Sequence, residues 1–128
     1  MAIEVIGSPV FLPNGTQVPL SKAMRAGDFV FFSGQLAFGA DGKIVDGGIV
    51  AQTQQCLDNI QALLNEAGLS RKDIVKSTIW LTNTQDFPAF NKAYERFFNE
   101  TPPTRSCVAS GLMLPEAIVE IEVIVYRS

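Results

Sequence analysis

Hydrophobic residues recur along this chain with two different periods, and the changes between the periods divide it into predicted elements. Residues 22–25 and 29–36 flank Ala26-Gly27-Asp28, a pattern that predicts a β-hairpin with a tight glycine turn. The second segment is apolar at odd and even positions alike, which is typical of a strand covered on both faces. We therefore expect residues 29–36 to form a central strand.

A helical period begins after Gly47-Gly48 and continues to Gly68, the glycine expected to cap the helix. The predicted buried stripe on this helix comprises Val50, Thr53, Cys56, Leu57, Ile60, Leu63, Leu64 and Ala67. Because Cys56 lies within the stripe, we interpret it as a core thiol that packs like a small hydrophobic side chain.

Residues 74–82 are rich in β-branched side chains and alternate with a period near two, which predicts a strand. Asp86 can then cap a second helix, whose aromatic side consists of Phe87, Phe90, Tyr94, Phe97 and Phe98. Pro102-Pro103 ends this helical region, because proline disfavours the helical conformation in the residue before it.

Two more strands are predicted, at residues 104–110 and 117–126. In the second of them Val119, Ile121, Val123 and Val125 form an apolar face, so alternation places Glu120 and Glu122 together on the other face. The order is then a hairpin, a helix, a strand, a helix and two strands. This order predicts an α+β sandwich with both helices on one face of the sheet.

Length and composition indicate the broad class. With 128 residues the chain is expected to form a single domain, residues 1–128. Hydrophobic residues make up 47%, yet no apolar run approaches the roughly 18 residues of a membrane span, and the first residues lack a basic signal segment. We expect a cytoplasmic protein with no membrane partner, and a homo-oligomer that buries part of its apolar surface.

Charge and residue usage narrow the chemistry. The net charge is −3, so no basic field attracts phosphates and nucleic acid is not an expected partner. The chain has no histidine, and its two cysteines, Cys56 and Cys107, lack CxxC spacing, which favours free thiols and argues against a metal site. Any reaction must therefore use carboxylates, arginine, tyrosine, thiol or backbone groups.

Arg105 lies in the segment with the clearest chemical signal. In an extended chain behind two prolines, Arg105, Cys107 and Ala109 share one face. The planar guanidinium matches a carboxylate, so this segment can present a clamp for a carboxylate substrate. The alternative is a surface arginine in an ion pair with Glu120, Glu122 or another neighbour, and the residues alone leave both interpretations open.

An ordered set of short segments resembles the RidA/YjgF family of imine and enamine deaminases. The segments run in order between about Pro19 and Tyr126. They are Ser33-Gly34-Gln35, Ala51-Gln52-Thr53, Leu57-Asp58-Asn59-Ile60, Glu66-Ala67-Gly68-Leu69, Asp73-Ile74-Val75-Lys76, Asn91 with Tyr94, Phe97-Phe98, Pro103 with Arg105-Ser106-Cys107-Val108, and Val119-Glu120-Ile121-Glu122. The resemblance implies a chorismate-mutase-like fold with a mixed sheet, assembled as a homotrimer with clefts between subunits. It also implies hydrolysis of 2-imino and 2-enamine acids, of the 2-iminobutanoate and 2-iminopropanoate type, to 2-oxo acids and ammonia without metal or cofactor.

The resemblance further implies roles for individual residues. Arg105 matches the arginine that binds the substrate carboxylate, Glu120 the carboxylate that positions or activates water, and Cys107 a position whose backbone groups hold substrate and water. The other implied substrate-binding residues are Leu20, Ser33, Gly34, Asn91, Tyr94 and Ser106. For the thiol itself, packing is favoured over nucleophilic catalysis, because no base is visible that would form a thiolate.

One position departs from the family pattern. Val18-Pro19-Leu20 stands where the family usually has Gly-Pro-Tyr, so Leu20 offers apolar contact in place of an aromatic hydroxyl. This difference keeps open a second function, a non-catalytic module that binds or senses 2-oxo acids with the same arginine. A third function, the endoribonuclease activity for which parts of the family are named, is disfavoured by an acidic chain with no histidine and no basic stripe.

Overall fold

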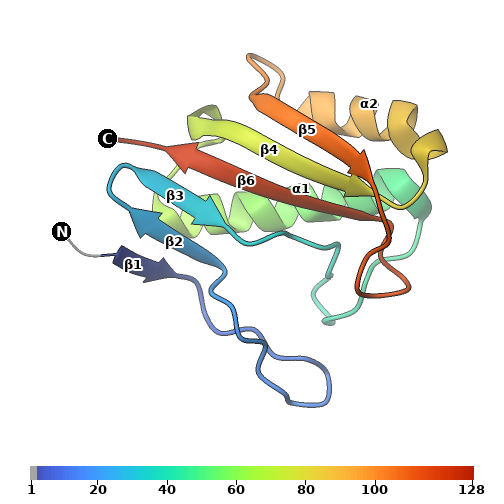
Figure 1. The fold of residues 1–128 in the computed structure, drawn as a ribbon, viewed down its shortest axis with the longest axis horizontal. Helices are drawn as coiled ribbons and strands as arrows, with labels where there is room; N and C mark the ends of the chain where they lie inside the picture. The colour runs from blue at the N-terminus through green and yellow to red at the C-terminus, as the bar shows by residue number, and fades with distance from the viewer. Residues whose placement is uncertain (1–2) are drawn as a thin grey trace.

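A computed structural model describes residues 3–128, which form one six-stranded sheet with two α-helices (Figure 1). The strands are β1 (Ile3–Ile6), β2 (Ala23–Ala26), β3 (Phe29–Phe32), β4 (Ile74–Leu81), β5 (Thr104–Ala109) and β6 (Val119–Tyr126). The helices are α1 (Gly48–Ala67) and α2 (Phe87–Phe97), and short 3-10 turns occupy Arg71–Asp73 and Thr84–Asp86. The strand order is β1-β2-β3-β6-β4-β5, in which β4 and β5 are parallel and the other neighbours are antiparallel. The sheet is therefore mixed, as predicted.

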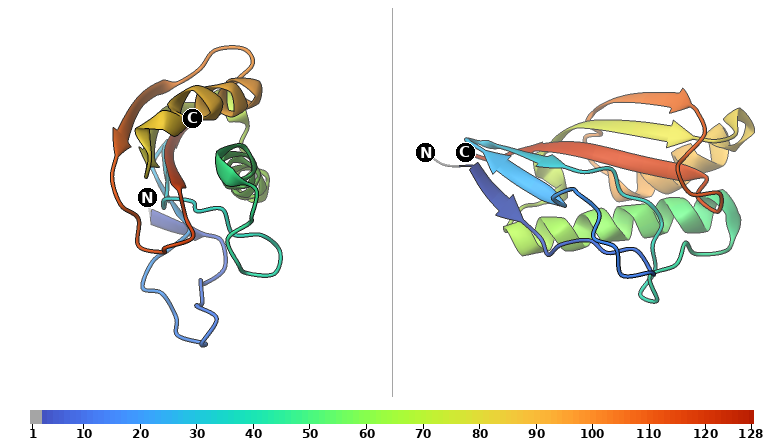
Figure 2. Two further views of the ribbon diagram at one scale, coloured as in Figure 1. Left: turned by 90° about the vertical axis from the view of Figure 1, so that its right-hand side faces the viewer. Right: turned by 60° about the horizontal axis from the view of Figure 1, so that its bottom comes forward.

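Both helices pack on the same face of the sheet, which the left view of Figure 2 shows along the strands. The core lies between the sheet and the helices. On β6 the alternating residues Val119, Ile121, Val123 and Val125 are at most 1% exposed, and α1 adds the fully buried Cys56, Leu57, Ile60 and Leu64. The predicted two-layer sandwich and the core position of the Cys56 thiol are thus confirmed.

The prediction for residues 29–36 is only partly right. β3 is an interior strand, but it ends at Phe32 and only one of its faces is covered in the single chain. Val30 and Phe32 are buried, whereas Phe29 and Phe31 are 42% and 46% exposed. The Phe29 ring centroid lies 5.1 Å from that of Tyr126, the residue opposite it on β6. One chain therefore leaves an apolar area open on the sheet face that the helices do not cover.

The boundaries of α1 follow its glycines, but its predicted stripe contains one error. Gly68 adopts the left-handed conformation, with φ of 71°, and its N–H bonds to the carbonyls of Leu64 and Asn65, as a C-cap glycine does. Val50, however, is 45% exposed, while Ile49 is buried. Each residue turns the helix by about 100°, so Val50 lies roughly 120° from Cys56 and Ile49 within roughly 20° of it.

Two further local features differ from the prediction. Asp86 occupies the position before α2, but its side chain makes no capping hydrogen bond. Instead Asn83 Oδ1 accepts from the N–H of Gln85 at 2.9 Å, at the start of the preceding 3-10 turn. The edge strand β1 was not predicted, because its four residues are too few to display a period and their pairing with β2 is a tertiary feature.

Candidate functional site

Arg105 is placed by the β4-α2-β5 crossover, the part of the sheet with parallel strands. In the register of that pair, Arg105 lies beside Ser77, which is fully buried under α2. Neighbouring residues of parallel strands share a face, so Arg105 and Cys107 point toward the helices. Ser106 and Val108 point to the opposite face, as alternation predicted.

The Arg105 guanidinium is held by α2 and has no acidic partner among residues 3–128. Its Nη2 donates to Asn91 Oδ1 at 2.8 Å. Its Cζ lies 5.1 Å from the ring centroid of Tyr94, 5.5 Å from that of Phe87 and 5.8 Å from that of Phe90, distances typical of cation–π contacts. Within residues 3–128 the ion pairs are Lys72 with Glu100 and Arg127 with Asp73, and neither involves Arg105.

Within residues 3–128 the Arg105 side chain contacts α2 and does not contact the carboxylates of β6. The alternative pairing with Glu120 or Glu122 is not formed, because both carboxylates lie on the other face of the sheet. A guanidinium has five N–H donors in a planar fork, and Asn91 accepts one of them here. The remaining donors are available to a carboxylate ligand.

Tyr94 supports the arginine with its ring, while its hydroxyl is engaged elsewhere. The Tyr94 hydroxyl oxygen lies 2.5 Å from Ser77 Oγ, in a hydrogen bond buried between α2 and β4. Burial raises the pKa of the Tyr94 phenol, although the bond to Ser77 and the nearby Arg105 charge act in the opposite direction. In this arrangement Tyr94 offers no hydroxyl to a ligand.

Ser77 was not predicted as a site residue. The signal for it in the sequence is a polar residue at an inward position of an otherwise apolar strand face.

Cys107 is half-buried beside the arginine. Burial raises the pKa of its thiol above the ordinary value, and the Arg105 charge offsets only part of that rise. The thiol is therefore protonated at neutral pH, which agrees with the packing role predicted for it.

An apolar pocket of about 250 Å³ adjoins this group, at the carboxyl ends of β4 and β5. It is lined by Leu81, Thr84, Phe87, Cys107, Val108 and Ala109. Two residues of the pocket also lie close to Arg105. The Phe87 ring makes a cation–π contact with the guanidinium, and the charge of Arg105 partly offsets the rise that burial causes in the pKa of the Cys107 thiol. A ligand whose carboxylate meets Arg105 can therefore place an apolar group in this pocket. Sequence periodicity did not reveal Leu81 or Thr84, because neither residue belongs to a functional pattern along the chain.

Glu120 belongs to a second group on the open face of the sheet. Burial, together with the negative charge of Glu122, raises the pKa of the Glu120 carboxyl. The side chain lies directly over Gly34: a Cβ at Gly34 would stand 2.9 Å from Glu120 Cδ and overlap its Oε2. Phe31 on β3 pairs with Ile124 on β6, and Gln35, beyond the end of β3, pairs with Ile121. The chain that follows β3 thus advances by four residues while β6 advances by three, so the pairing contains a bulge here.

The remaining predicted residues lie on the β2–β3 side. Ser33 Oγ donates to the carbonyl of Ser21 at 2.7 Å, which ties the two strand ends together. Leu20, 42% exposed, precedes β2. The structure thus assembles Arg105, Asn91, Tyr94 and Cys107 at the β5 edge, and Gly34 with Glu120 nearer the centre. It does not unite the two groups within one chain.

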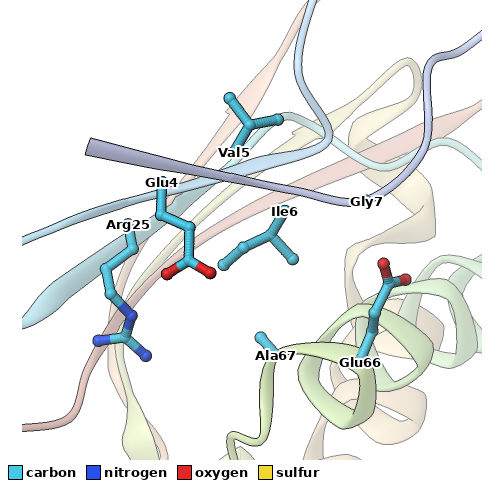
Figure 3. A pocket seen from close by; sticks show the side chains of 7 residues that line it. All are labelled: Glu4, Val5, Ile6, Gly7, Arg25, Glu66 and Ala67. Atoms are coloured by element: carbon cyan, nitrogen blue, oxygen red, sulfur yellow. The ribbon is translucent and has the colours of Figure 1, made fainter. Parts of the chain in front are cut away.

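A second hollow, of about 230 Å³, separates β1 and β2 from the end of α1 (Figure 3). Glu4 and Arg25 line it from the strands and Glu66 from the helix.

In the described part of the chain, no three acidic or cysteine side chains come together as a metal site would require. Neither helix within residues 3–128 is long and apolar enough to cross a membrane.

The fold and its contacts define a small α+β domain in which Arg105 lies beside an apolar pocket and, in the described part of the chain, has no acidic partner. The family described as "Endoribonuclease L-PSP" matches residues 14–127. Over 116 residues the chain is 38% identical to "3-aminoacrylate deaminase RutC" of Acinetobacter baylyi, a match that covers 88% of this chain and 92% of that protein. The chain belongs to the endoribonuclease L-PSP family.

Solved structures agree with this assignment. A protein of unknown function from Yersinia pestis, YyfA of the conserved Rid protein family, superposes with a TM-score of 0.87 at 36% identity, covering 98% of this chain and 99% of that one. Escherichia coli TdcF with bound serine superposes with a TM-score of 0.85 at 33% identity, again covering 98% and 99%. The resemblance to the RidA/YjgF family and the expected fold are therefore confirmed.

Proposed function

We propose that this protein is a deaminase that hydrolyses 2-imino and 2-enamine acids to 2-oxo acids and ammonia. The observation that carries the proposal is the Arg105 guanidinium, which is oriented by Asn91 and three aromatic rings yet has no carboxylate partner in residues 3–128. The deaminase name of the Acinetobacter baylyi relative supports the reaction class. The serine bound to Escherichia coli TdcF supports a ligand with a carboxylate.

Substrate binding follows from the geometry around Arg105. The substrate carboxylate takes the free donors of the guanidinium, a charge-assisted and directional interaction. Its side chain enters the apolar pocket between Leu81, Phe87 and Val108. This fit favours imino acids with small or medium apolar side chains over those that carry a second charge, because an unpaired charge in an apolar pocket is costly.

The chemical step is an addition of water followed by loss of ammonia. Water forms a bond to the imine carbon, and the electron pair of the C=N bond moves to nitrogen, which takes up a proton. The resulting amino alcohol expels ammonia as its hydroxyl becomes the carbonyl of the 2-oxo acid. Glu120 accepts the proton of water and returns it to nitrogen, a task suited to a carboxyl whose pKa burial raises above its ordinary value. No metal or cofactor is required.

The complete site requires a second copy of the chain. Arg105 and Glu120 lie on opposite faces of one sheet, so a cleft that contains both takes the arginine group from one subunit and the glutamate group from its neighbour. The exposed apolar residues Phe29, Phe31 and Tyr126 on the open face support such contacts between copies. We propose a homotrimer with three clefts of this kind, in which Leu20, Ser33 and Gly34 line the Glu120 side. Cytoplasmic location stays a prediction from composition.

The test generates 2-imino acids in situ with an amino-acid oxidase and follows release of 2-oxo acid and ammonia with and without the protein. Acceleration by the wild type, lost in Arg105→Ala, supports the proposal. If the protein accelerates nothing but binds 2-oxo acids in calorimetry, and Arg105→Ala abolishes that binding, the non-catalytic binding module takes the place of the deaminase.

A further inference from the structure

The sheet-facing side of α1 carries polar side chains that are not explained by core packing. Gln52 is only 5% exposed, and Asn59 is half-buried seven residues later, two turns along the same side of the helix. Buried polar side chains in a core are costly unless hydrogen-bonded, so their partners indicate what they are for.

Gln52 binds the turn that leads into β6. Its Nε2 donates to the carbonyl of Glu116 at 2.9 Å, and its Oε1 accepts from the N–H of Ile118 at 3.0 Å. Both ends of the amide are thus satisfied by backbone atoms two residues apart. Ile118 in turn accepts from the N–H of Thr82, just beyond β4, which ties the turn to the sheet. Gln52 therefore holds the turn immediately before β6, which begins at Val119, one residue before Glu120.

Asn59 binds the segment that follows Gly34. Its Nδ2 donates to the carbonyls of Leu36 and Phe38, at 3.1 and 3.0 Å. Its Oδ1 accepts from Gln55 Nε2 at 2.9 Å, which fixes the orientation of the amide. This segment lies outside the regular strands, so its inward carbonyls have no strand partner and depend on a side-chain donor.

The turn before β6 and the segment after Gly34 meet where the Glu120 side chain lies over Gly34, a contact called here the Glu120 seat. Gln35 and Ile121 exchange two backbone hydrogen bonds, of 2.7 and 3.0 Å, one residue beyond Gly34 and Glu120. Between Gln52 and Asn59 on α1, Cys56 Sγ donates to the carbonyl of Val119 at 3.8 Å. α1 thus contacts both sides of the Gly34–Glu120 contact from beneath the sheet, although neither amide touches the glutamate.

We propose that Gln52 and Asn59 are positioning residues that hold the two irregular segments so that the Glu120 carboxylate stays seated over Gly34. The inference rests on the proposed function for its catalytic meaning, but the seat itself is a structural statement. Without either amide the segments separate, water reaches the carboxylate from the bulge, and the side chain leaves the position from which it serves the cleft.

The Glu120 carboxyl reports directly on its seat. Its charged neighbour is Glu122 on the same strand face, and its other titratable neighbour is the neutral Cys56 thiol across the sheet on α1. Trp80 stands opposite it on β4 and Lys76 lies further along that strand, opposite Ile124. None of these residues is altered by substitutions at Gln52 or Asn59. A change in the titration of Glu120 therefore reports penetration of water, not a change of charge nearby.

The experiment compares Gln52→Met and Asn59→Leu with Gln54→Met, an exposed glutamine of the same helix that bonds only to Asp58. The pKa of Glu120 is measured by carbon NMR titration of glutamate-labelled protein, with the resonance assigned from Glu120→Gln. We expect the pKa of Glu120 to fall by at least about half a unit in Gln52→Met and Asn59→Leu, because water relieves the burial that raises it, and to stay unchanged in Gln54→Met. For 2-imino acids, we expect kcat to fall about tenfold with KM within about twofold, since the Arg105 group is untouched.

A Glu120 pKa that stays within about 0.2 units of wild type in folded Gln52→Met and Asn59→Leu would overturn the inference. If Gln52→Met does not fold, Gln52→Asn, which keeps the amide but is one methylene shorter, decides with the same titration. The titration needs no turnover. A shifted pKa in a protein without deaminase activity would therefore retain the seat while rejecting the proposed reaction.

Discussion

Arg105 and Glu120 lie on opposite faces of the same sheet, on strands separated by β4. Arg105 points toward α2 and bonds to Asn91, whereas Glu120 lies over Gly34 on the face that the helices leave open. A small substrate cannot touch both side chains of one chain, because the sheet lies between them. If both residues act on one substrate, they belong to different subunits.

Subunits that lack different halves of the site should therefore complement one another. Arg105→Ala and Glu120→Ala are each expected to be inactive, but their co-expression should restore activity. In random trimers, roughly three quarters contain both variants and each of these has one complete site of three, so about a quarter of wild-type specific activity is expected. The two purified variants mixed immediately before the assay are the control. Absence of restored activity, or a monomer mass by light scattering, would contradict the shared site.

Removal of the Arg105 fork should affect binding and turnover without affecting assembly. We expect Arg105→Ala to lower kcat/KM for 2-imino acids at least about a hundredfold, which corresponds to roughly 2.7 kcal/mol. Arg105→Lys should fall between, because lysine keeps the charge but loses the planar pair of donors. The matched control is Arg96→Ala, an exposed arginine of α2. Equal loss in Arg96→Ala would point to a general effect of charge on the helix.

Gly34→Ala should displace the Glu120 carboxylate. The new Cβ would overlap Oε2 and stand 2.9 Å from Cδ, so the flexible side chain must move away. Because the side chain can move, we expect a loss of at least about tenfold in kcat with a change in melting temperature of only a few degrees. Gly111→Ala is the control, since a Cβ there has no atom within 4 Å. Wild-type kcat in a folded Gly34→Ala would show that the seat is not needed for the reaction.

The raised pKa of Glu120 has a consequence for stability that can be measured without substrate. The folded state holds the proton more tightly than the unfolded chain, so the contribution of this group is fully present below the unfolded pKa and is lost as the pH rises through the folded pKa. Glu120→Gln should therefore be more stable than wild type at about pH 8 and show no such gain near pH 4. Urea unfolding at both pH values tests this, with Glu95→Gln on the surface of α2 as control. A gain that is equal at both pH values would indicate packing instead of titration.

Leu20 is expected to influence substrate choice. If it lines the cleft on the Glu120 side, Leu20→Tyr should leave folding unchanged and shift preference toward small aliphatic imino acids, because the ring fills space and the hydroxyl adds a hydrogen bond. Relative kcat/KM across a panel of imino acids measures the shift. Val5→Tyr, at another exposed apolar position 60% accessible, is the control for a surface tyrosine. Identical preferences before and after the Leu20 change would place this residue outside the pocket.

Local periodicity was sufficient for much of the fold. The two faces of β6 and the end of α1 at Gly68 could be predicted because alternation and helical turns are properties of the backbone itself. The same rule placed Arg105 and Cys107 on one face. The prediction failed at Val50, because which side of α1 is buried depends on where the sheet lies. It also failed at Asp86, because Asn83 caps the preceding 3-10 turn instead.

The sequence by itself determined which side chains share a face of each element, and the ordered motifs pointed to the family and to Arg105 and Glu120. Only the tertiary structure decided that these two lie on opposite faces, that Arg105 has Asn91 and no carboxylate as a partner within residues 3–128, and that Gln52 reaches Glu116 and Ile118. The reason is that a face is set by dihedral angles within a few residues, whereas strand order and the partners of a buried amide depend on contacts between residues far apart in the chain.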